Sequence, residues 1–120
     1  QVCICEIKLD DIYDKAFDLN LKIKDIPKFP SIQRDFSLLI NQDISFSSIK
    51  EIALNTEKKF LESVDLFDVY EGEKISNSKK SYGIRFTFTD MKKTLTDKHI
   101  DKVMNKLLKE FQIHLNAELR

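Results

Sequence analysis

Hydrophobic and polar residues alternate along residues 61–90, in two runs separated by a polar loop at residues 73–80. The apolar positions of the second run are Tyr82, Ile84, Phe86 and Phe88, and the positions between them are Ser81, Gly83, Arg85, Thr87 and Thr89. A period of two is typical of a strand that packs one face on a core and turns the other face to water. The two runs therefore predict a β-hairpin with one open face.

Two further strand faces follow from the same alternation. The first run of the hairpin places Phe67 and Val69 on one face, and on the other face Leu66, Asp68 and Tyr70. Residues 34–40 predict another strand, with one face formed by Phe36, Leu38 and Ile40 and the other by Asp35, Ser37 and Leu39. Residues 113–120 alternate again, and they predict a closing strand.

Two helices are predicted from apolar residues spaced three and four positions apart. The first begins near Ser45 or Ser47, which are suitable N-caps, and its stripe consists of Phe46, Ile49, Ile52, Ala53 and Thr56. The second begins after the N-cap candidate Thr96, and its stripe consists of Ile100, Val103, Met104, Leu107, Leu108 and Phe111. Each helix therefore has one apolar side to bury.

The predicted order is strand, helix, strand, strand, helix, strand, which is the ferredoxin-like β-α-β-β-α-β pattern of the α+β class. Because each helix has a single apolar stripe, both helices are expected on one face of a four-stranded antiparallel sheet. The expected sheet order is closing strand, first strand, third strand, second strand. The opposite face stays open, and it is where we expect the function to lie.

An N-terminal arm is predicted ahead of this domain. Residues 1–9 alternate like a strand, Asp10 and Asp11 are candidate N-caps, and residues 12–19 have the pattern of a short helix. Pro27 and Pro30 favour extended backbone and mark a boundary. We therefore divide the chain into an arm and linker at residues 1–28, from a preceding catalytic-like module, and a domain at residues 29–120.

Composition and charge narrow the class of protein. The chain has 120 residues, 42% of them hydrophobic, which fits one globular domain. Its 20 basic and 20 acidic residues cancel, which argues against nucleic-acid binding through bulk charge alone. No apolar run is long enough to predict a membrane span. No signal peptide is visible and the chain does not start with Met, so we expect a piece of a longer protein. Cys3 and Cys5 are expected to be reduced thiols, which fits a cytoplasmic location.

Residue patterns typical of catalysis are missing. The only glycines are Gly72 and Gly83, so there is no glycine-rich phosphate loop. Cys3 and Cys5 have no neighbouring histidine or cysteine cluster, so no metal site is predicted. The two histidines, His99 and His114, are far apart, and no nucleophile turn accompanies them. We therefore predict a non-catalytic chain without catalytic or metal-binding residues.

Several short motifs occur in a characteristic order across residues 27–120. They are Pro27-Lys28-Phe29-Pro30 with Arg34-Asp35-Phe36, Leu61-Glu62-Ser63-Val64, Leu66-Phe67-Asp68-Val69-Tyr70 with Gly72, Lys79-Lys80-Ser81, Asp90 with Thr94-Leu95-Thr96-Asp97, and Ala117-Glu118-Leu119-Arg120. In these motifs the chain resembles the C-terminal region of the beta chains of bacterial phenylalanyl-tRNA synthetases. The matching region is similar to their ferredoxin-fold anticodon-binding domain, and residues 1–20 resemble the end of their preceding catalytic-like module.

This resemblance implies a function that the residue patterns alone do not give. It implies a parent aminoacyl-tRNA synthetase that joins phenylalanine to tRNA(Phe) with ATP and magnesium during protein biosynthesis. It implies two alpha and two beta chains, with the catalytic centre in the alpha chain and the anticodon loop held by the C-terminal domain of the beta chain. In the family's motifs, the tyrosine and serine that contact the first anticodon base correspond to Tyr70 and Ser81.

The strand patterns support an RNA site on the open face. Tyr70 shares its predicted face with Asp68, and Ser81 shares its face with Arg85, so Tyr70 and Ser81 are expected to be cross-strand neighbours. An aromatic ring beside small polar groups suits the bases of a single-stranded loop, which stack and form hydrogen bonds through their edges. The predicted RNA-binding residues are Tyr70, Ser81, Asp68, Arg85, Ser37 and Lys80.

Two other functions remain open for this fold. Similar β-α-β-β-α-β domains act as regulatory modules that bind small molecules, but the turn at Asn41-Gln42-Asp43 lacks the glycines expected of them. A protein-interaction domain could use the open face or an edge strand without binding RNA. Aromatic and basic residues on one face favour RNA over this second alternative.

Overall fold

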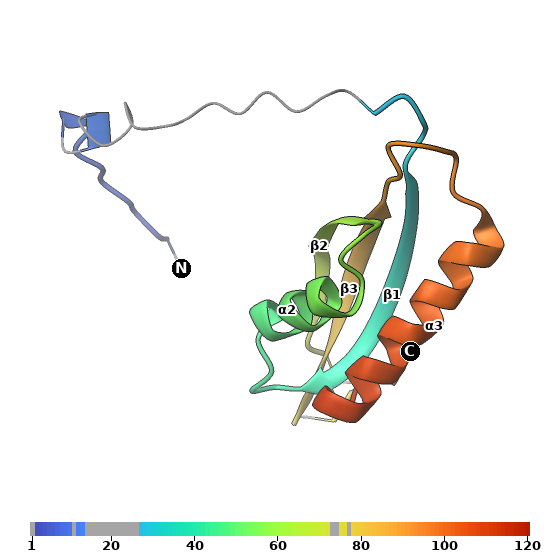
Figure 1. Cartoon of the computed structure of the whole chain (residues 1–120). Coiled ribbons are helices and arrows are strands. Elements are labelled where there is room, and N and C mark those ends of the chain that lie inside the picture. The colour runs from blue at the N-terminus through green and yellow to red at the C-terminus, as the bar shows by residue number, and fades with distance from the viewer. Residues whose placement is uncertain (1, 11, 14–26, 73–74, 77) are drawn as a thin grey trace.

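The computed structural model describes residues 2–10, 12–13, 27–72, 75–76 and 78–120. Within these residues six elements follow one another, and Figure 1 labels all of them except β4. They are β1 (Ile32–Asn41), α2 (Phe46–Thr56), β2 (Leu61–Tyr70), β3 (Lys79–Phe88), α3 (Asp97–Leu115) and β4 (Glu118–Leu119). The predicted order of strands and helices is confirmed.

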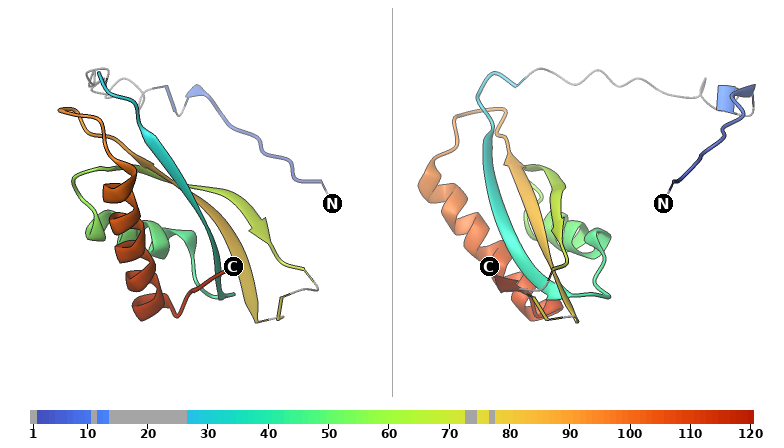
Figure 2. Two further views of the ribbon diagram at one scale, coloured as in Figure 1. Left: turned by 90° about the vertical axis from the view of Figure 1, so that its right-hand side faces the viewer. Right: turned by 180° about the vertical axis from the view of Figure 1, so that it is seen from behind.

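The strands form one four-stranded sheet in the order β2-β3-β1-β4, and each neighbouring pair is antiparallel. This is the sheet order expected from the ferredoxin-like pattern. Both helices lie on the same side of the sheet, and the other side carries no helix (Figure 2). The α+β, ferredoxin-like class is therefore confirmed, and the sheet presents one covered face and one face that we call the open face.

The core fills the space between the sheet and the two helices. Leu38 and Ile40 of β1 are fully buried, as are Ile84, Phe86 and Phe88 of β3. The helices contribute the predicted stripes, with buried residues Ile49, Ala53, Ile100, Val103, Met104, Leu107 and Phe111. Phe86 is central to this core, because its ring contacts those of Phe36 and Phe111 at centroid distances of 5.5 and 6.2 Å.

The helix ends follow from local hydrogen bonding. Ser45 is the N-cap of α2, and its side chain accepts a hydrogen bond from the Ser48 N–H at 3.3 Å. At the other end of α2, the Lys106 ammonium of α3 donates to the Thr56 carbonyl at 2.9 Å, where a positive charge suits the helix dipole. This bond ties the two helices together over the covered face.

The predicted closing strand at residues 113–120 is wrong over most of its length. Helix α3 continues to Leu115, and β4 contains only Glu118 and Leu119. Asn116 adopts the left-handed conformation (φ 49°), and its N–H bonds back to the Gln112 carbonyl at 3.1 Å. Asparagine tolerates this conformation and ends helices in the same way as glycine. The alternation of residues 113–119 therefore spans a helix end, a turn and a short strand.

The arm differs from its prediction as well. Residues 2–9 form no strand, and their side chains are exposed. A strand needs a hydrogen-bonded neighbour, and none of the described strands pairs with this segment. A helical turn does begin at Asp10, with the N–H groups of Ile12 and Tyr13 donating to the Leu9 carbonyl. The rest of the predicted helix, residues 14–19, lies outside the described residues.

Candidate nucleic-acid interface

The register of the sheet brings most of the predicted site residues together on the open face. Tyr70 of β2 is the direct cross-strand partner of Ser81 on β3. Gly83 pairs with Asp68 on one side and with Ser37 of β1 on the other. The Ser37 and Ser81 hydroxyls form a hydrogen bond of 3.2 Å between β1 and β3. Three strands therefore contribute to one polar cluster at the Tyr70 end of the sheet.

A β-bulge in β2 changes which side chains reach the open face. The register shifts between Leu66, which pairs with Ile84, and Asp68, which pairs with Gly83. The extra residue, Phe67, resets the alternation, as an inserted residue in one strand does. The predicted faces of Leu66 and Phe67 are therefore wrong, because Leu66 packs against the core and Phe67 is 56% exposed.

The Phe67 ring covers the centre of the open face. A Cβ added to Gly83 would lie 2.9 Å from two atoms of the Phe67 ring, so the ring rests directly on the Gly83 backbone. The Arg85 guanidinium lies 5.2 Å from the centroid of the same ring. A larger side chain at position 83 would displace the Phe67 ring, so the packing of this ring requires glycine at position 83. Part of the face expected to be open to water is thus closed by an aromatic ring.

Arg120 is a site residue that sequence reasoning missed. Its N–H donates to the Ser37 carbonyl at 2.8 Å, and its guanidinium lies 5.0 Å from the centroid of the Tyr70 ring. The sequence pattern that could have revealed it is weak, because β4 has only two residues. Arg120 follows β4 and continues the alternation from Glu118. The end of the chain therefore crosses to the Tyr70 ring and places a cation beside it.

Gly72 lies against the same tyrosine. A Cβ at Gly72 would lie 2.3 Å from Tyr70 Oη, 2.4 Å from Cζ and 3.0 Å from Cε1. These three distances place the added carbon over the face of the ring, near its hydroxyl end. The hydrogen atom of glycine is what allows the half-buried ring to pack there, so Gly72 and Arg120 both fix the position of Tyr70.

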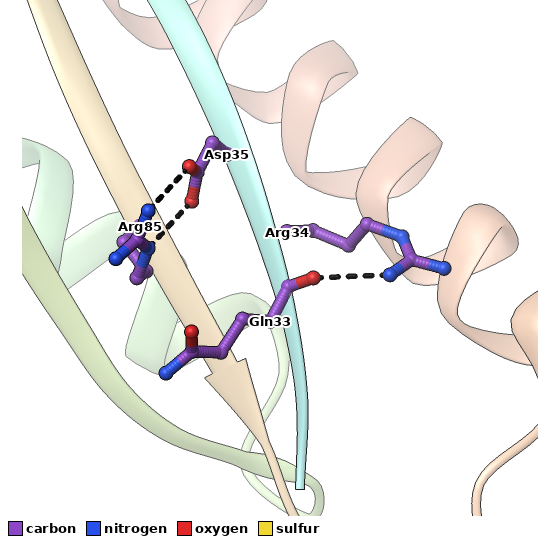
Figure 3. A network of polar contacts seen from close by, with 4 residues as sticks. All are labelled: Gln33, Arg34, Asp35 and Arg85. Atoms are coloured by element: carbon purple, nitrogen blue, oxygen red, sulfur yellow. Dashed lines mark hydrogen bonds and ion pairs between the residues drawn. The ribbon is translucent and has the colours of Figure 1, made fainter.

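Arg85 is neutralised by a partner on the adjacent strand. Its Nε and Nη2 donate to the Asp35 carboxylate at 2.9 and 2.8 Å, in the two-pronged geometry shown in Figure 3. The hydrogen bond from Arg85 holds the pKa of Asp35 below its ordinary value, and the bond from Asp35 raises the pKa of Arg85. Arg34 points to the other side of the strand, where it pairs with Asp97 of α3.

The structure separates Lys80 from the other predicted site residues. Lys80 is buried on the covered face, where its ammonium donates to the Gln42 carbonyl at 2.8 Å and lies 4.8 Å from the Tyr82 ring centroid. Its neighbour Lys79 forms an ion pair of 2.7 Å with Glu118. Because successive strand residues point to opposite faces, Lys80 cannot join Ser81 at the cluster. Its prediction as an RNA contact is corrected accordingly.

The two histidines and the acidic residues form no recognisable reactive centre within the described ranges. His99 packs its ring edge-on against Phe60 at 5.0 Å, and His114 pairs with Glu110 along α3 at 3.3 Å. In the same residues, no three His, Cys, Asp or Glu side chains come together as metal ligands would. None of the helices described has the length and apolar character needed to span a membrane.

A family model decides the relationship of the chain. The model of the ferredoxin-fold anticodon binding domain matches residues 27–120, which include every residue of the polar cluster. The chain belongs to this family. Membership agrees with the sheet order, the helix-free face and the order of motifs found in the sequence. The prediction of a binding domain agrees with the activity for which the family is named.

Relatives of this anticodon binding domain align with all or nearly all of the chain, including the arm. The chain is 42% identical over its full length to the phenylalanine–tRNA ligase beta subunit of Bacteroides thetaiotaomicron, of which it covers 15%. It is 38% identical over 99% of its length to that of Porphyromonas gingivalis, covering 14%. It is 40% identical over 98% of its length to that of Clostridium acetobutylicum, covering 15%. The resemblance to these beta chains is confirmed.

Proposed function

We propose that this domain binds the anticodon loop of tRNA(Phe) with its open face, as part of the beta chain of a phenylalanine–tRNA ligase. The observation that carries the proposal is the cross-strand pairing of Tyr70 with Ser81 on the helix-free face. Family membership and the names of the relatives supply the class of ligand. The ring, the hydroxyls and the nearby Asp68 carboxylate are the groups expected where unstacked RNA bases are bound.

Each residue of the cluster has a distinct role in this proposal. A base stacks on the Tyr70 ring, and the Arg120 guanidinium either moves aside or stacks on the base in turn. The exposed Asp68 carboxylate accepts hydrogen bonds from base N–H groups. Ser81 is only 3% exposed, so its hydroxyl acts mainly by holding that of Ser37. Arg85, paired with Asp35, orders the face rather than attracting phosphates.

The wider role proposed for the parent protein is aminoacylation of tRNA(Phe) with ATP and magnesium. In this proposal the catalytic centre lies in an alpha chain of a heterotetramer of two alpha and two beta chains, located in the cytoplasm. Residues 29–120 form the anticodon-binding domain, and residues 1–28 form the arm and linker of the preceding module. The support is that the beta-subunit relatives align with the arm as well as with the domain.

Tyr70→Ala tests the proposal through binding of the 120-residue chain to the anticodon stem-loop of tRNA(Phe). Loss of one base stack should weaken binding by about 1–3 kcal/mol, or roughly 5- to 150-fold. Tyr70→Phe should retain most of the affinity, because the ring remains. Tyr13→Ala is the matched control, since Tyr13 is exposed and lies outside the family match. Titrations at low and moderate salt separate stacking from charge contacts.

A second stem-loop with its first anticodon base changed measures base preference. We expect the original chain to prefer the correct loop, and Tyr70→Ala to bind both loops equally. Equal affinity of the original chain for both loops, lost on adding salt, would reduce the interaction to nonspecific charge contacts. Unchanged binding in Tyr70→Ala would reject the site assignment while leaving the family membership intact.

A further inference from the structure

A lysine-lined groove lies at the end of the sheet opposite to Tyr70. It has a volume of about 470 Å³, and it lies between Lys59-Phe60, ahead of β2, and residues 89–93, after β3. The lysines that line it are Lys59, Lys92 and Lys93, and all three side chains are exposed. We call this site the lysine groove. Figure 1 shows the loop after β3 at the end of the sheet opposite to the start of β3.

The charge of the lysine groove is not cancelled by ion pairs. Within residues 27–72, 75–76 and 78–120, no ion pair involves Lys59, Lys92 or Lys93. The acidic group in the groove, Asp90, accepts the backbone N–H of Lys92 at 2.9 Å. Glu57, just outside it, accepts the N–H groups of Lys59 and Phe60. In a chain with zero net charge, the groove is thus lined by three cations without an ion pair and by one carboxylate, and the Glu62 carboxylate lies at its edge, where it accepts a hydrogen bond from the Thr89 hydroxyl.

A second feature favours anions at the same place. A smaller groove of about 200 Å³ shares Phe60 and Lys93 with the lysine groove and extends to Thr96 and His99. Thr96 is the N-cap of α3, but its side chain makes no capping hydrogen bond. The positive end of the helix dipole therefore lies beside the lysines, with the Asp97 carboxylate in the same first turn paired to Arg34, and helix ends of this kind favour phosphate groups.

The groove also has apolar surface, which a free inorganic anion would not need. Met91 is 52% exposed at its edge, and the Phe60 ring is half-buried with the Lys59 ammonium 4.8 Å from its centroid. Cations beside exposed apolar groups suit a chain of sugars and phosphates. We propose that the lysine groove binds the phosphodiester backbone of RNA, at a segment away from the anticodon loop.

The length of the strands sets the distance between the two RNA contacts. Strands β2 and β3 each have ten residues, with Tyr70 and Ser81 near one end and Leu61 and Phe88 at the other. At about 3.3 Å per residue, the lysine groove lies on the order of 30 Å from the Tyr70 cluster. This second contact, which rests on RNA being the ligand of the domain, belongs to a more distant part of the tRNA than the loop itself.

The test compares two sets of lysine substitutions of equal charge. The groove variant carries Lys59→Gln, Lys92→Gln and Lys93→Gln, and the control variant carries Lys50→Gln, Lys102→Gln and Lys109→Gln on exposed helix positions. Both are titrated with whole tRNA(Phe) and with its anticodon stem-loop over a range of salt. We expect the groove variant to bind whole tRNA about tenfold more weakly at low salt, with a salt slope reduced by roughly 2–3. The control variant and the stem-loop should show little change.

Each outcome decides the inference. Equal losses of affinity in the groove and control variants would assign the effect to overall charge and overturn the inference. Unchanged binding of whole tRNA by the groove variant would overturn it as well. An equal loss for the stem-loop would place the lysines at the loop and overturn the separate contact. Tyr70→Ala, measured in parallel, distinguishes these failures, because it reports loop recognition without changing any groove residue.

Discussion

The two faces of the sheet obey different physical requirements, although alternate residues of the same strands form them. On the covered face, β3 contributes Ile84, Phe86 and Phe88, which are fully buried between the strands and the helices. On the open face, the same strand contributes Ser81, Gly83 and Arg85, which make a hydrogen bond to Ser37, a backbone surface for the Phe67 ring and an ion pair with Asp35. Packing against the helices dictates the first set, whereas the second set is held by polar contacts and by the Phe67 ring on a face that carries no helix.

Two phenylalanines make the comparison direct. Phe86 is fully buried among Phe36, Phe111 and the helices, whereas Phe67 lies on the open face with 56% of its surface exposed. Removing the buried ring leaves a cavity in a closely packed core. Removing the exposed ring uncovers Gly83 but leaves little void, because water already reaches it. The same chemical change should therefore have very different consequences on the two faces.

Phe86→Ala should lower the free energy of unfolding by about 3–5 kcal/mol, the usual loss for a buried phenylalanine. Phe67→Ala should lower it by about 1 kcal/mol or less, as for most exposed positions. Urea denaturation of both variants, followed by circular dichroism, measures the difference. Equal losses would contradict the distinction between the faces, because they would give the open face the same role in stability as the core.

The covered face is also the part that the sequence predicted best. The alternation of β3 and the stripes of both helices identified its core residues, because burial requires apolar residues at regular spacing. The open face has no such requirement, so its details were harder to predict. The bulge at Phe67 leaves no mark in the hydrophobic pattern, and it reversed the expected faces of Leu66 and Phe67. The pairing of Tyr70 with Ser81 was predicted, because Tyr70 lies after the bulge, where β2 alternates regularly again.

The ends of elements account for the remaining errors. Residues 113–119 alternate in polarity, but α3 extends to Leu115, where the left-handed Asn116 ends it. A strand of two residues carries too little pattern to be recognised, so the approach of Arg120 to Tyr70 was not predicted. Lys80 was placed with Ser81 because of its sequence proximity, although adjacent strand residues face opposite ways. Tertiary contacts, rather than local pattern, decide the first two of these positions, whereas the face of Lys80 follows from the alternation of the strand itself.

Gly72→Ala sharpens the comparison by changing the open face without changing the core. The added carbon would lie within 2.4 Å of Tyr70 Oη and Cζ, so the ring must move. Gly72 does not have a positive φ, so alanine fits its backbone and the free energy of unfolding should stay nearly constant. Binding to the anticodon stem-loop should weaken by up to the value of one stack, about 1–3 kcal/mol.

A double-mutant cycle separates this effect from a general disturbance. In a chain that already carries Tyr70→Ala, Gly72→Ala should cause no further loss, because its effect acts through the tyrosine ring. Isothermal titration of the four chains with the stem-loop gives the coupling energy. Additive losses would show that Gly72 affects binding independently of Tyr70, and they would remove its assigned role as a positioning residue.

Asp35→Asn tests the ion pair between Asp35 and Arg85 on the open face. The hydrogen bond from Arg85 lowers the pKa of Asp35, so the folded chain releases this proton more readily than the unfolded chain. The pair therefore contributes its full stability above the ordinary aspartate pKa of about 3.9 and loses it as the pH falls through the lower, folded value. Both side chains are more than a third exposed, so screening by water keeps the contribution of the pair small.

Thermal unfolding of the original chain and Asp35→Asn, measured between neutral and strongly acidic pH, isolates this small effect. At pH 7 the original chain should be slightly more stable, and the difference should disappear once the pH falls below the lowered pKa of Asp35, where the carboxylate becomes protonated. Asp101→Asn, on the exposed side of α3, controls for the loss of one negative charge. A difference that stays constant down to low pH would assign the effect to packing, and the open face would then resemble the covered face in what stabilises it.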